Sequence, residues 1–126
     1  MNDAFTRTRL IIGEKGVRKL KKSCVIVFGL GGVGAYAVEG LARCGIGRFI
    51  VVDHDTVGLT NINRQLPALH STLGMAKVDV MAARIKDINP DASVETLKMF
   101  YRPESAGAID FSKADCIVDA IDTTRA

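Results

Sequence analysis

Closely spaced glycines are the first residues of this chain whose pattern points to chemistry. Gly29, Gly31 and Gly34 form a GxGxxG pattern directly after an apolar run, with Gly32 between them. In such a loop the first glycine permits a tight turn, the second lets phosphate approach the backbone, and the third lets a helix pack closely on a strand. Asp53 follows Gly34 by 19 residues, where an acid that binds a ribose hydroxyl belongs. The spacing predicts a nucleotide site.

The polar segment that follows Asp53 suits the phosphates of the nucleotide. It begins at Asp55 and holds Asn61, Arg64 and Gln65, and Lys77 comes soon after. Two cations beside a phosphate-binding loop suit a triphosphate, whose charge they would neutralise in the transition state. A dehydrogenase that binds NAD has no evident need for this cluster, and the chain lacks the GxxxxGK[ST] pattern of a Walker-type loop. The pattern therefore favours ATP, with an NAD-dependent oxidoreductase as the alternative from another class.

Asp122 is the candidate metal ligand. It stands at the C-terminal end of a predicted strand, and ligands bind at that edge of a parallel sheet. Its carboxylate could hold Mg²⁺, although a turn residue or helix N-cap is an equal alternative. We expect His54 and His70 to be bystanders. The three cysteines have no CxxC spacing, so neither a zinc site nor a disulfide framework is expected, and we predict that they are reduced core residues.

Alternating strands and helices must position these residues. Short apolar runs predict strands at 24–28, 49–52, 94–99 and 116–122, and helical spacing predicts helices at 32–44 and 75–88. A short basic helix is expected at 13–22, and a small helical or irregular segment at 103–111. In the helix that follows the glycine loop, the predicted apolar stripe is Val33, Ala37, Leu41 and Cys44. The alternation implies an α/β fold: a Rossmann-like, open, mostly parallel sheet with flanking helices.

Length and composition place limits on the chain. It has 126 residues, is 48% hydrophobic and carries a net charge of +3, which excludes disorder. No apolar run approaches the ~20 residues that cross a bilayer, so a cytoplasmic protein is expected. The chain stops four residues after its fourth predicted strand, and we expect a sheet truncated there, without the second half of a doubly wound fold.

The charge is unevenly spread. Residues 1–22 hold seven basic and two acidic residues, a net of +5, which leaves −2 for residues 23–126. We therefore divide the chain into a basic N-terminal helical leader, 1–22, and the N-terminal part of a nucleotide-binding domain, 23–126. The leader could attract a polyanion such as nucleic acid, or it could be only the solvated face of an amphipathic helix.

These residues together resemble the ubiquitin-activating-like (ThiF/MoeB/HesA) family, which includes the sulphur-carrier adenylyltransferases of molybdopterin and thiamine synthesis. The resemblance covers about residues 5–123 and implies that the site binds MgATP and activates a carboxylate as an acyl adenylate. By position, it implies that Asp53 holds the ribose and Asp122 binds Mg²⁺. Arg9 matches the family's N-terminal arginine, which reaches the ATP site of a partner subunit, so a homodimer is implied. The matching segments are the glycine loop, 53–57, Asn61 with Asn63-Arg64-Gln65, Gly74 with Lys77, and 119–122.

Within the family the sequence is most similar to the branch that acts on threonylcarbamoyladenosine in tRNA. This similarity rests on Arg9-Leu10 followed by Gly13-Glu14-Lys15, on the Asn61–Gln65 segment, and on Ile88-Asn89-Pro90. It implies ATP-dependent cyclisation of that nucleoside to a hydantoin with loss of water, with tRNA as substrate, DNA not expected, and sulphur-transfer or desulfurase proteins as further partners. The alternatives are a sulphur-carrier protein adenylyltransferase and a nucleotide-binding module without enzymatic activity.

Overall fold

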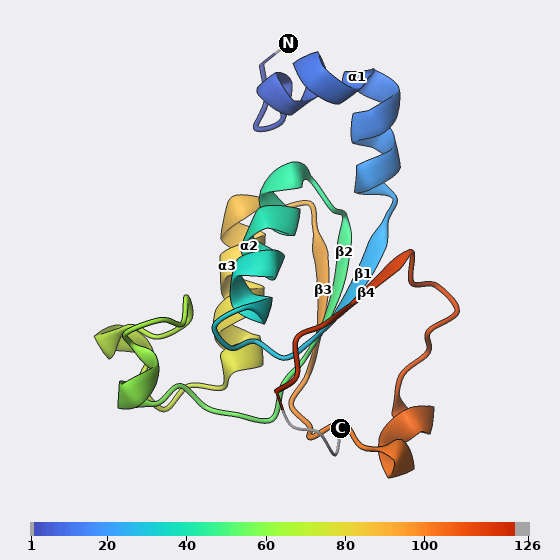
Figure 1. Ribbon diagram of the computed structural model, residues 1–126. Helices are drawn as coiled ribbons and strands as arrows, with labels where there is room; N and C mark the ends of the chain where they lie inside the picture. Colours follow the sequence, from blue (N-terminus) through green and yellow to red (C-terminus); the bar gives the residue numbers. More distant parts are fainter. Residues whose placement is uncertain (1, 123–126) are drawn as a thin grey trace.

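A four-stranded sheet forms the centre of the computed structural model, which describes residues 2–122 (Figure 1). Every strand pairing is parallel, and the strand order is β3-β2-β1-β4. This order matches the first four strands of a Rossmann sheet, so the predicted fold class is confirmed. The strands are β1 (Cys24–Phe28), β2 (Arg48–Val52), β3 (Ser93–Leu97) and β4 (Cys116–Asp119).

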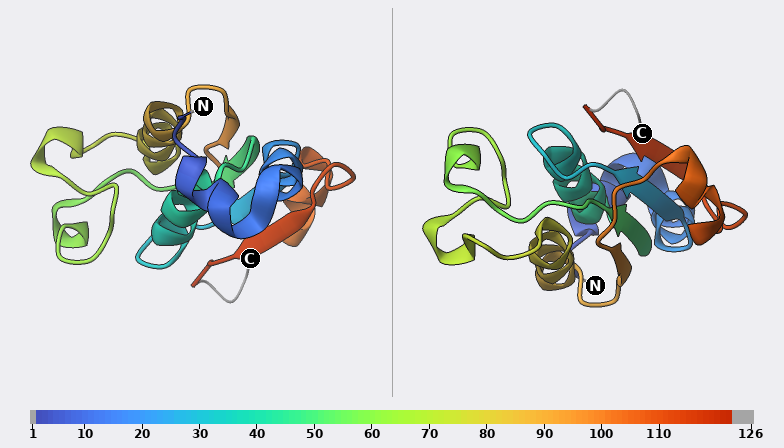
Figure 2. Two further views of the ribbon diagram at one scale, coloured as in Figure 1. Left: turned by 90° about the horizontal axis from the view of Figure 1, so that it is seen from above. Right: turned by 90° about the horizontal axis from the view of Figure 1, so that it is seen from below.

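The two central strands, β1 and β2, are apolar on both faces because both faces are covered. Helices α2 (Gly34–Cys44) and α3 (Lys77–Ile88) pack on one face, as the views along the sheet show (Figure 2). The other face packs against residues 98–115, which include a short 3₁₀ segment, η3 (Pro103–Ala108). Val25 and Val27 lie on the helical side, whereas Ile26 and Phe28 lie on the other side. This double burial explains the unbroken apolar runs.

Helix α2 lies where we predicted it but presents a different face to the core. Ala35, Val38 and Ala42 are fully buried, whereas Val33 is 74% exposed and Cys44 is exposed. The predicted stripe was therefore wrong at Val33 and Cys44, whereas Leu41 is partly buried and packs against the core. Both sets of residues repeat at helical spacing, and the small side chains of Ala35 and Ala42 allow α2 to lie close to the sheet.

The N-terminal helix is longer than predicted. Helix α1 runs over Thr6–Lys21 and bends sharply at Gly13, whose φ of 74° is in the left-handed region that glycine tolerates. It lies at the end of the sheet where the strands begin (Figure 1). Of its residues only Val17 is buried, while Leu10 and Ile11 are more than 80% exposed.

The prediction of three core cysteines is right for one of them. Cys24 is buried in β1, where loss of water raises the pKa of its thiol. Cys44 and Cys116 are exposed, at the end of α2 and the start of β4. In residues 2–122 no helix is both long and apolar enough to span a membrane.

An ion pair joins the two helices that cover the sheet, and it predicts how stability depends on pH. Nε and Nη2 of Arg84 donate to the Glu39 carboxylate at 2.6–3.1 Å. This hydrogen bonding holds the pKa of Glu39 below its ordinary value, which is roughly 4.3. The stabilisation is therefore present above pH ~4.3, and it is lost as the pH falls through the lower pKa of the folded state.

We expect Glu39→Gln to lower the free energy of unfolding by about 1 kcal/mol at pH 7, since Arg84 is partly exposed to water. The difference from the parent protein should shrink as the pH falls, because protonation of Glu39 progressively removes its carboxylate charge. Urea unfolding at pH 7 and at pH 3 measures this. Arg43→Gln is the control, because Arg43 lies 3.7 Å from Glu39 and is 60% exposed. An equal loss at both pH values would show that the carboxylate charge has no part.

Candidate active site

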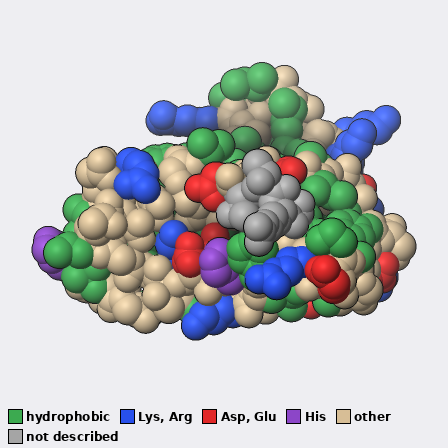
Figure 3. All heavy atoms as spheres, turned by 60° about the horizontal axis from the view of Figure 1, so that its bottom comes forward, with side chains coloured by type: hydrophobic (Ala, Val, Ile, Leu, Met, Phe, Trp, Pro, Cys, Tyr) green, Lys and Arg blue, Asp and Glu red, His purple; other side chains and the backbone are tan. Residues whose placement is uncertain are grey.

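A cleft opens at the carboxyl ends of the strands, the face shown in Figure 3. Acidic and basic side chains gather near the centre of this face, together with histidine. The cleft holds about 220 Å³, which is less than the roughly 300 Å³ at the lower end for small-molecule pockets. The described residues therefore surround a nucleotide-sized ligand only in part. Nine of the predicted residues line it: Gly29, Gly31, Asp53, Asp55, Asn61, Arg64, Gln65, Lys77 and Asp122.

The glycine loop connects β1 to α2 at the base of this cleft. Gly29 has a φ of 91°, and a Cβ there would lie 2.6 Å from the carbonyl oxygen of Ala120. A Cβ at Gly34 would lie 1.7 Å from the carbonyl oxygen of Gly29, so α2 begins in direct contact with the end of β1. The predicted turning and close-packing roles of these two glycines are confirmed. Gly32 and Gly34 do not line the cleft, and Gly34 is buried beneath the loop.

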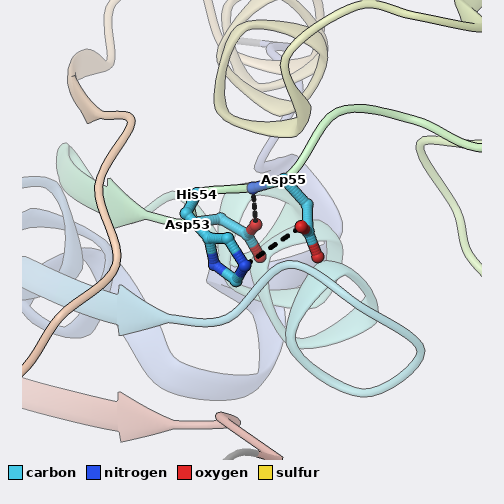
Figure 4. A group of neighbouring side chains, drawn as sticks. All are labelled: Asp53, His54 and Asp55. Atoms are coloured by element: carbon cyan, nitrogen blue, oxygen red, sulfur yellow. Dashed lines mark hydrogen bonds and ion pairs between the residues drawn. The ribbon is translucent and has the colours of Figure 1, made fainter.

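Asp53 ties the glycine loop to the end of β2. Its Oδ2 accepts a hydrogen bond from the backbone N–H of Leu30 at 2.7 Å, and its Oδ1 accepts one from that of Asp55 at 2.7 Å. Figure 4 shows Asp53 together with His54 and Asp55. The carboxylate therefore already holds the loop in shape, and it lines the cleft at the position predicted for a ribose-binding acid.

Arg64 lies over the glycine loop. Its Cγ comes within 3.8 Å of the place where a Gly32 Cβ would stand. Its Nη1 donates to the carbonyl oxygen of Thr60 at 3.1 Å and to Oδ1 of Asn63 at 2.9 Å. Among residues 2–122 no carboxylate pairs with this guanidinium, so its charge is available to an anion in the cleft.

Lys77 is a buried cation that points to the same cleft. It is 4% exposed, and within the described part of the chain its one charged neighbour is Asp55, with Nζ and Oδ2 3.7 Å apart. A charge so far removed from water requires a close partner, and a separation of 3.7 Å is longer than a hydrogen bond. The position of Lys77 therefore favours an additional anion, such as a phosphate.

The side-chain amides of Asn61 and Gln65 also line the cleft. Asn61 accepts a hydrogen bond from the N–H of Gly58 through Oδ1 at 2.8 Å, which shapes the turn that carries Arg64. The Nε2 of Gln65 lies 3.6 Å from the place where a Gly31 Cβ would stand, next to the loop. The Oε1 of Gln65 is buried and has no hydrogen-bond partner among the described residues. A buried unpaired acceptor at the edge of a cleft favours a donor from a ligand or a water molecule.

One cluster, Asp53 with His54 and Asp55, and one separate carboxylate, Asp122, are candidates for holding a metal ion. Ligand atoms of Asp53, His54 and Asp55 lie within 4.8 Å of one another. Both Asp53 oxygens accept backbone N–H groups, and Asp55 faces His54 at 3.1 Å and Lys77. The polar atoms of this group are therefore already paired with one another and with neighbouring groups, which favours a hydrogen-bonding cluster over a metal site. Asp122 is exposed and lines the cleft just beyond β4, where oxygen ligands suit Mg²⁺.

Arg9 lies away from the cleft within one chain. It lines a separate cavity together with Gly45 and Gly47, at the end of the sheet where the strands begin. Its guanidinium donates to both oxygens of Asp3 at 3.0 and 3.2 Å and also pairs with Glu14. This contact with Arg9 holds the pKa of Asp3 below its usual value.

The structure also brings residues to the cleft that the sequence interpretation missed. Met99, Phe100 and Tyr101 line it from the segment after β3, and His54, expected to be a bystander, lines it from the end of β2. Ala120 and Ile121 complete the edge near β4. The sequence did contain a signal for these residues, namely that each of them lies at or just after the end of a predicted strand. Residues that follow a parallel strand lie at the ligand-binding edge of the sheet.

A parallel sheet with this strand order, a glycine loop before the first crossover helix and an acid at the end of β2 define a Rossmann-like nucleotide-binding protein. The ThiF family model matches residues 5–126. The chain belongs to the ThiF family.

Within the ThiF family, the chain is similar to proteins named tRNA threonylcarbamoyladenosine dehydratase. The chain is 52% identical to the tRNA threonylcarbamoyladenosine dehydratase of Bacillus subtilis, covering 94% of this chain and 47% of that protein. It is 40% identical to the enzyme of that name from Escherichia coli, over 96% of this chain and 45% of that one. A crystal structure of the E. coli dehydratase with ATP matches with a TM-score of 0.93 at 39% identity, covering 97% of this chain and 50% of that chain. The chain thus spans about half the length of these relatives.

Proposed function

We propose that the protein uses ATP to activate the threonyl carboxylate of threonylcarbamoyladenosine in tRNA, and that this nucleoside then closes to its hydantoin form. The observation that carries the proposal is that Arg64 and the buried Lys77 line the same cleft as the glycine loop. The similarity to the dehydratases of B. subtilis and E. coli supports the choice of substrate.

The site residues would act on a triphosphate as follows. The backbone at Gly31, which lines the cleft, and at Gly32, which lies next to Arg64 just outside the cleft lining, approaches the phosphates; Asp53 holds the ribose, and Asn61 and Gln65 order the phosphates. Arg64 and Lys77 act as catalytic residues by neutralising charge as the substrate carboxylate attacks the α-phosphate and pyrophosphate leaves. A nitrogen of the substrate then attacks the activated carbonyl, and AMP leaves with the carboxylate oxygen. The net change in the nucleoside is the loss of one water.

Magnesium fits this site through Asp122. Its exposed carboxylate shares the cleft with Asp55 and with both cations. The carboxylate oxygens of Asp122 are the kind of ligand that Mg²⁺ prefers. When bound, Mg²⁺ would neutralise charge on the phosphate oxygens.

Arg9 enters the proposal through a second copy of the chain. Within one chain it lies at the opposite end of the sheet from the cleft, so we propose a homodimer in which Arg9 reaches the phosphates of the partner site. Asp3 and Glu14 would then have to release the guanidinium, which can meet phosphate oxygens bidentately. We also propose a cytoplasmic location, with sulphur-transfer proteins as further partners.

Mass spectrometry of tRNA nucleosides tests the reaction. After incubation of threonylcarbamoyladenosine-containing tRNA with the protein, ATP and Mg²⁺, we expect this nucleoside to lose the mass of one water. A reaction without ATP serves as the control. An unchanged nucleoside in both reactions would overturn the assignment.

A sulphur-carrier adenylyltransferase is the second candidate. The chain is 40% identical to an adenylyltransferase and sulfurtransferase of Anopheles gambiae, covering 96% of this chain and 28% of that protein. This candidate predicts exchange of pyrophosphate into ATP only when a small carrier protein is present. Exchange that instead depends on the modified tRNA favours the dehydratase.

The proposed hydrogen bond between Asp53 and the ribose 2′-hydroxyl of ATP gives a testable prediction. We expect Asp53→Asn to weaken ATP binding roughly tenfold, because a charge-assisted hydrogen bond to the ribose contributes ~1.5–3 kcal/mol. We also expect the parent protein to prefer ATP to 2′-deoxy-ATP and the variant to lose that preference. Calorimetric titration of both nucleotides measures this. A preference that survives in the variant would assign the ribose to another residue.

The basic leader predicts a salt-dependent affinity for tRNA. Arg18, Lys19 and Lys21 in the last turn of α1 are exposed, and each phosphate contact contributes about one unit to the slope of log affinity against log salt. We expect Lys19→Gln with Lys21→Gln to reduce this slope by about two units. Filter-binding measurements of tRNA affinity at salt concentrations from about 50 to about 200 mM give this slope. A flat response of the parent protein would remove the leader from tRNA binding.

A further inference from the structure

A second cavity lies at the end of the sheet opposite the nucleotide cleft. It holds about 540 Å³, which is within the range of roughly 300 to about 1,000 Å³ for small-molecule pockets, whereas the cleft holds about 220 Å³. Its walls come from α1, from the turn that follows α2 and from the turn that follows α3. None of the described residues lines both the cavity and the cleft, so the nucleotide chemistry does not use this space.

The first half of α1 is held in place as one wall of this cavity. The helix bends at Gly13, and Arg9 before the bend pairs with Glu14 after it. The ring of Phe5 lies against the turn that follows α2, with its Cδ1 3.4 Å from the place where a Gly45 Cβ would stand. The wall is therefore built from specific contacts within the chain.

Asn89 is a buried amide in the opposite wall. It lines the cavity and is only 7% exposed. Its Oδ1 accepts a hydrogen bond from the backbone N–H of Asp91 at 3.3 Å, whereas its Nδ2 donates to no group among residues 2–122. A buried donor without a partner costs stability. The free amide N–H therefore favours an acceptor inside the cavity.

Two cations of α1 line the same cavity. Arg18 and Lys21 pair with no carboxylate within residues 2–122, and Asp91 is the one unpaired acid of the described lining. The other charged residues of the lining pair with one another, and they are Asp3, Arg9 and Glu14. Two free cations and a free amide N–H, against one free acid, favour an anionic ligand.

We propose that this cavity binds a small organic carboxylate. A carboxylate only accepts hydrogen bonds, and bonds from a cation to it are among the stronger ones, which suits Asn89 together with Arg18 and Lys21. The hydrocarbon part of the ligand would contact the apolar residues of the lining. These are Phe5, Val17, Ile88 and Pro90. The inference does not rest on the proposed function, because Asn89, Arg18 and Lys21 lie outside the nucleotide cleft.

Titration with hexanoate, followed by NMR of the amide groups, tests this site. We expect saturable shifts at Gly45, at Gly47 and at the side-chain amide of Asn89, which line the cavity. The amide of Gly31 in the cleft should not shift. Hexanol and hexylamine, which have the same chain without the carboxylate, should not produce these shifts.

Substitutions of the proposed donors provide the second part of the test. Asn89→Asp keeps an acceptor for Asp91 but removes the free N–H, and we expect it to weaken hexanoate binding tenfold or more, on the order of one charge-assisted hydrogen bond. Arg18→Gln should weaken it roughly tenfold for the same reason. Lys19→Gln is the matched control, because Lys19 is exposed in the same turn of α1 and does not line the cavity.

The outcomes decide the proposal. Weaker hexanoate binding in Arg18→Gln and Asn89→Asp, with unchanged binding in Lys19→Gln, supports it. Thermal unfolding checks that each variant folds, and the exposed Arg18 decides the matter if Asn89→Asp does not fold. Absence of saturable shifts with hexanoate, equal shifts with hexylamine, or equal binding in all variants overturns it. Tighter binding of inorganic phosphate than of hexanoate also overturns it, because the ligand would then be a phosphate group.

Discussion

Replacement of Arg64 by alanine should lower the rate of the ATP-dependent reaction on the order of 100-fold while the midpoint of thermal unfolding stays nearly unchanged. Arg64 is exposed, and its two hydrogen bonds go to Thr60 and Asn63 on the same turn. The folded state therefore loses little when it is removed. The transition state loses more, because removal of one donor to a developing charge costs ~10²–10³ in rate.

Arg43→Ala is the control for Arg64→Ala. Arg43 is an exposed arginine of α2 that does not line the cleft, so its loss should leave the rate unchanged. Steady-state rates with saturating tRNA, together with thermal unfolding of both variants, make the comparison. A similar rate for Arg64→Ala and Arg43→Ala would remove Arg64 from the catalytic residues. A large fall in the unfolding midpoint would assign it a structural role.

Gly34→Ala should have the largest effect on the fold. A Cβ at this position would stand 1.7 Å from the carbonyl oxygen of Gly29 and 3.1 Å from the Cβ of Ala120. Backbone atoms cannot move aside cheaply, so α2 must shift away from the end of β1. We expect a loss of ~3 kcal/mol or more in the free energy of unfolding, and loss of nucleotide binding in any protein that remains folded.

The matched control for Gly34→Ala is Gly40→Ala in the same helix. A Cβ at Gly40 has no atom within 4 Å outside its own helix and chain neighbours. Alanine there should therefore raise the stability by ~0.5–1 kcal/mol, through the better helix propensity of alanine. Urea unfolding compares the two variants. Equal stability of both would mean that the close contact between Gly29 and Gly34 does not constrain the helix.

The half of the site that the sequence predicted well is the half that depends on local patterns. The run from β1 through the glycine loop to Asp53 combines a buried strand, a loop that requires glycine, and a helix start within 30 residues. Each of these steps is decided by neighbours in the chain. Asp53 was found because a parallel crossover returns the chain to the same edge of the sheet.

The parts that were missed depend on contacts between distant segments. The buried face of α2 is set by its fit against the sheet and α3, so Ala35 and Val38 are buried although Val33 is larger than alanine. Phe100 and His54 come from the ends of different strands, and their meeting depends on the pairing of β2 with β3. Arg64 and Lys77 were found from residue type, but the burial of Lys77 required the packed structure.

Calorimetric titration with ATP and with NAD tests the central claim, that this cleft binds ATP, most directly. The cleft combines a glycine loop with two cations and with Asp122, and such a set suits a triphosphate with Mg²⁺ better than a dinucleotide. We predict that ATP binds in the presence of Mg²⁺, that it binds more weakly when Mg²⁺ is chelated, and that NAD gives no binding heat at the same concentration. Binding of NAD without binding of ATP would contradict the claim.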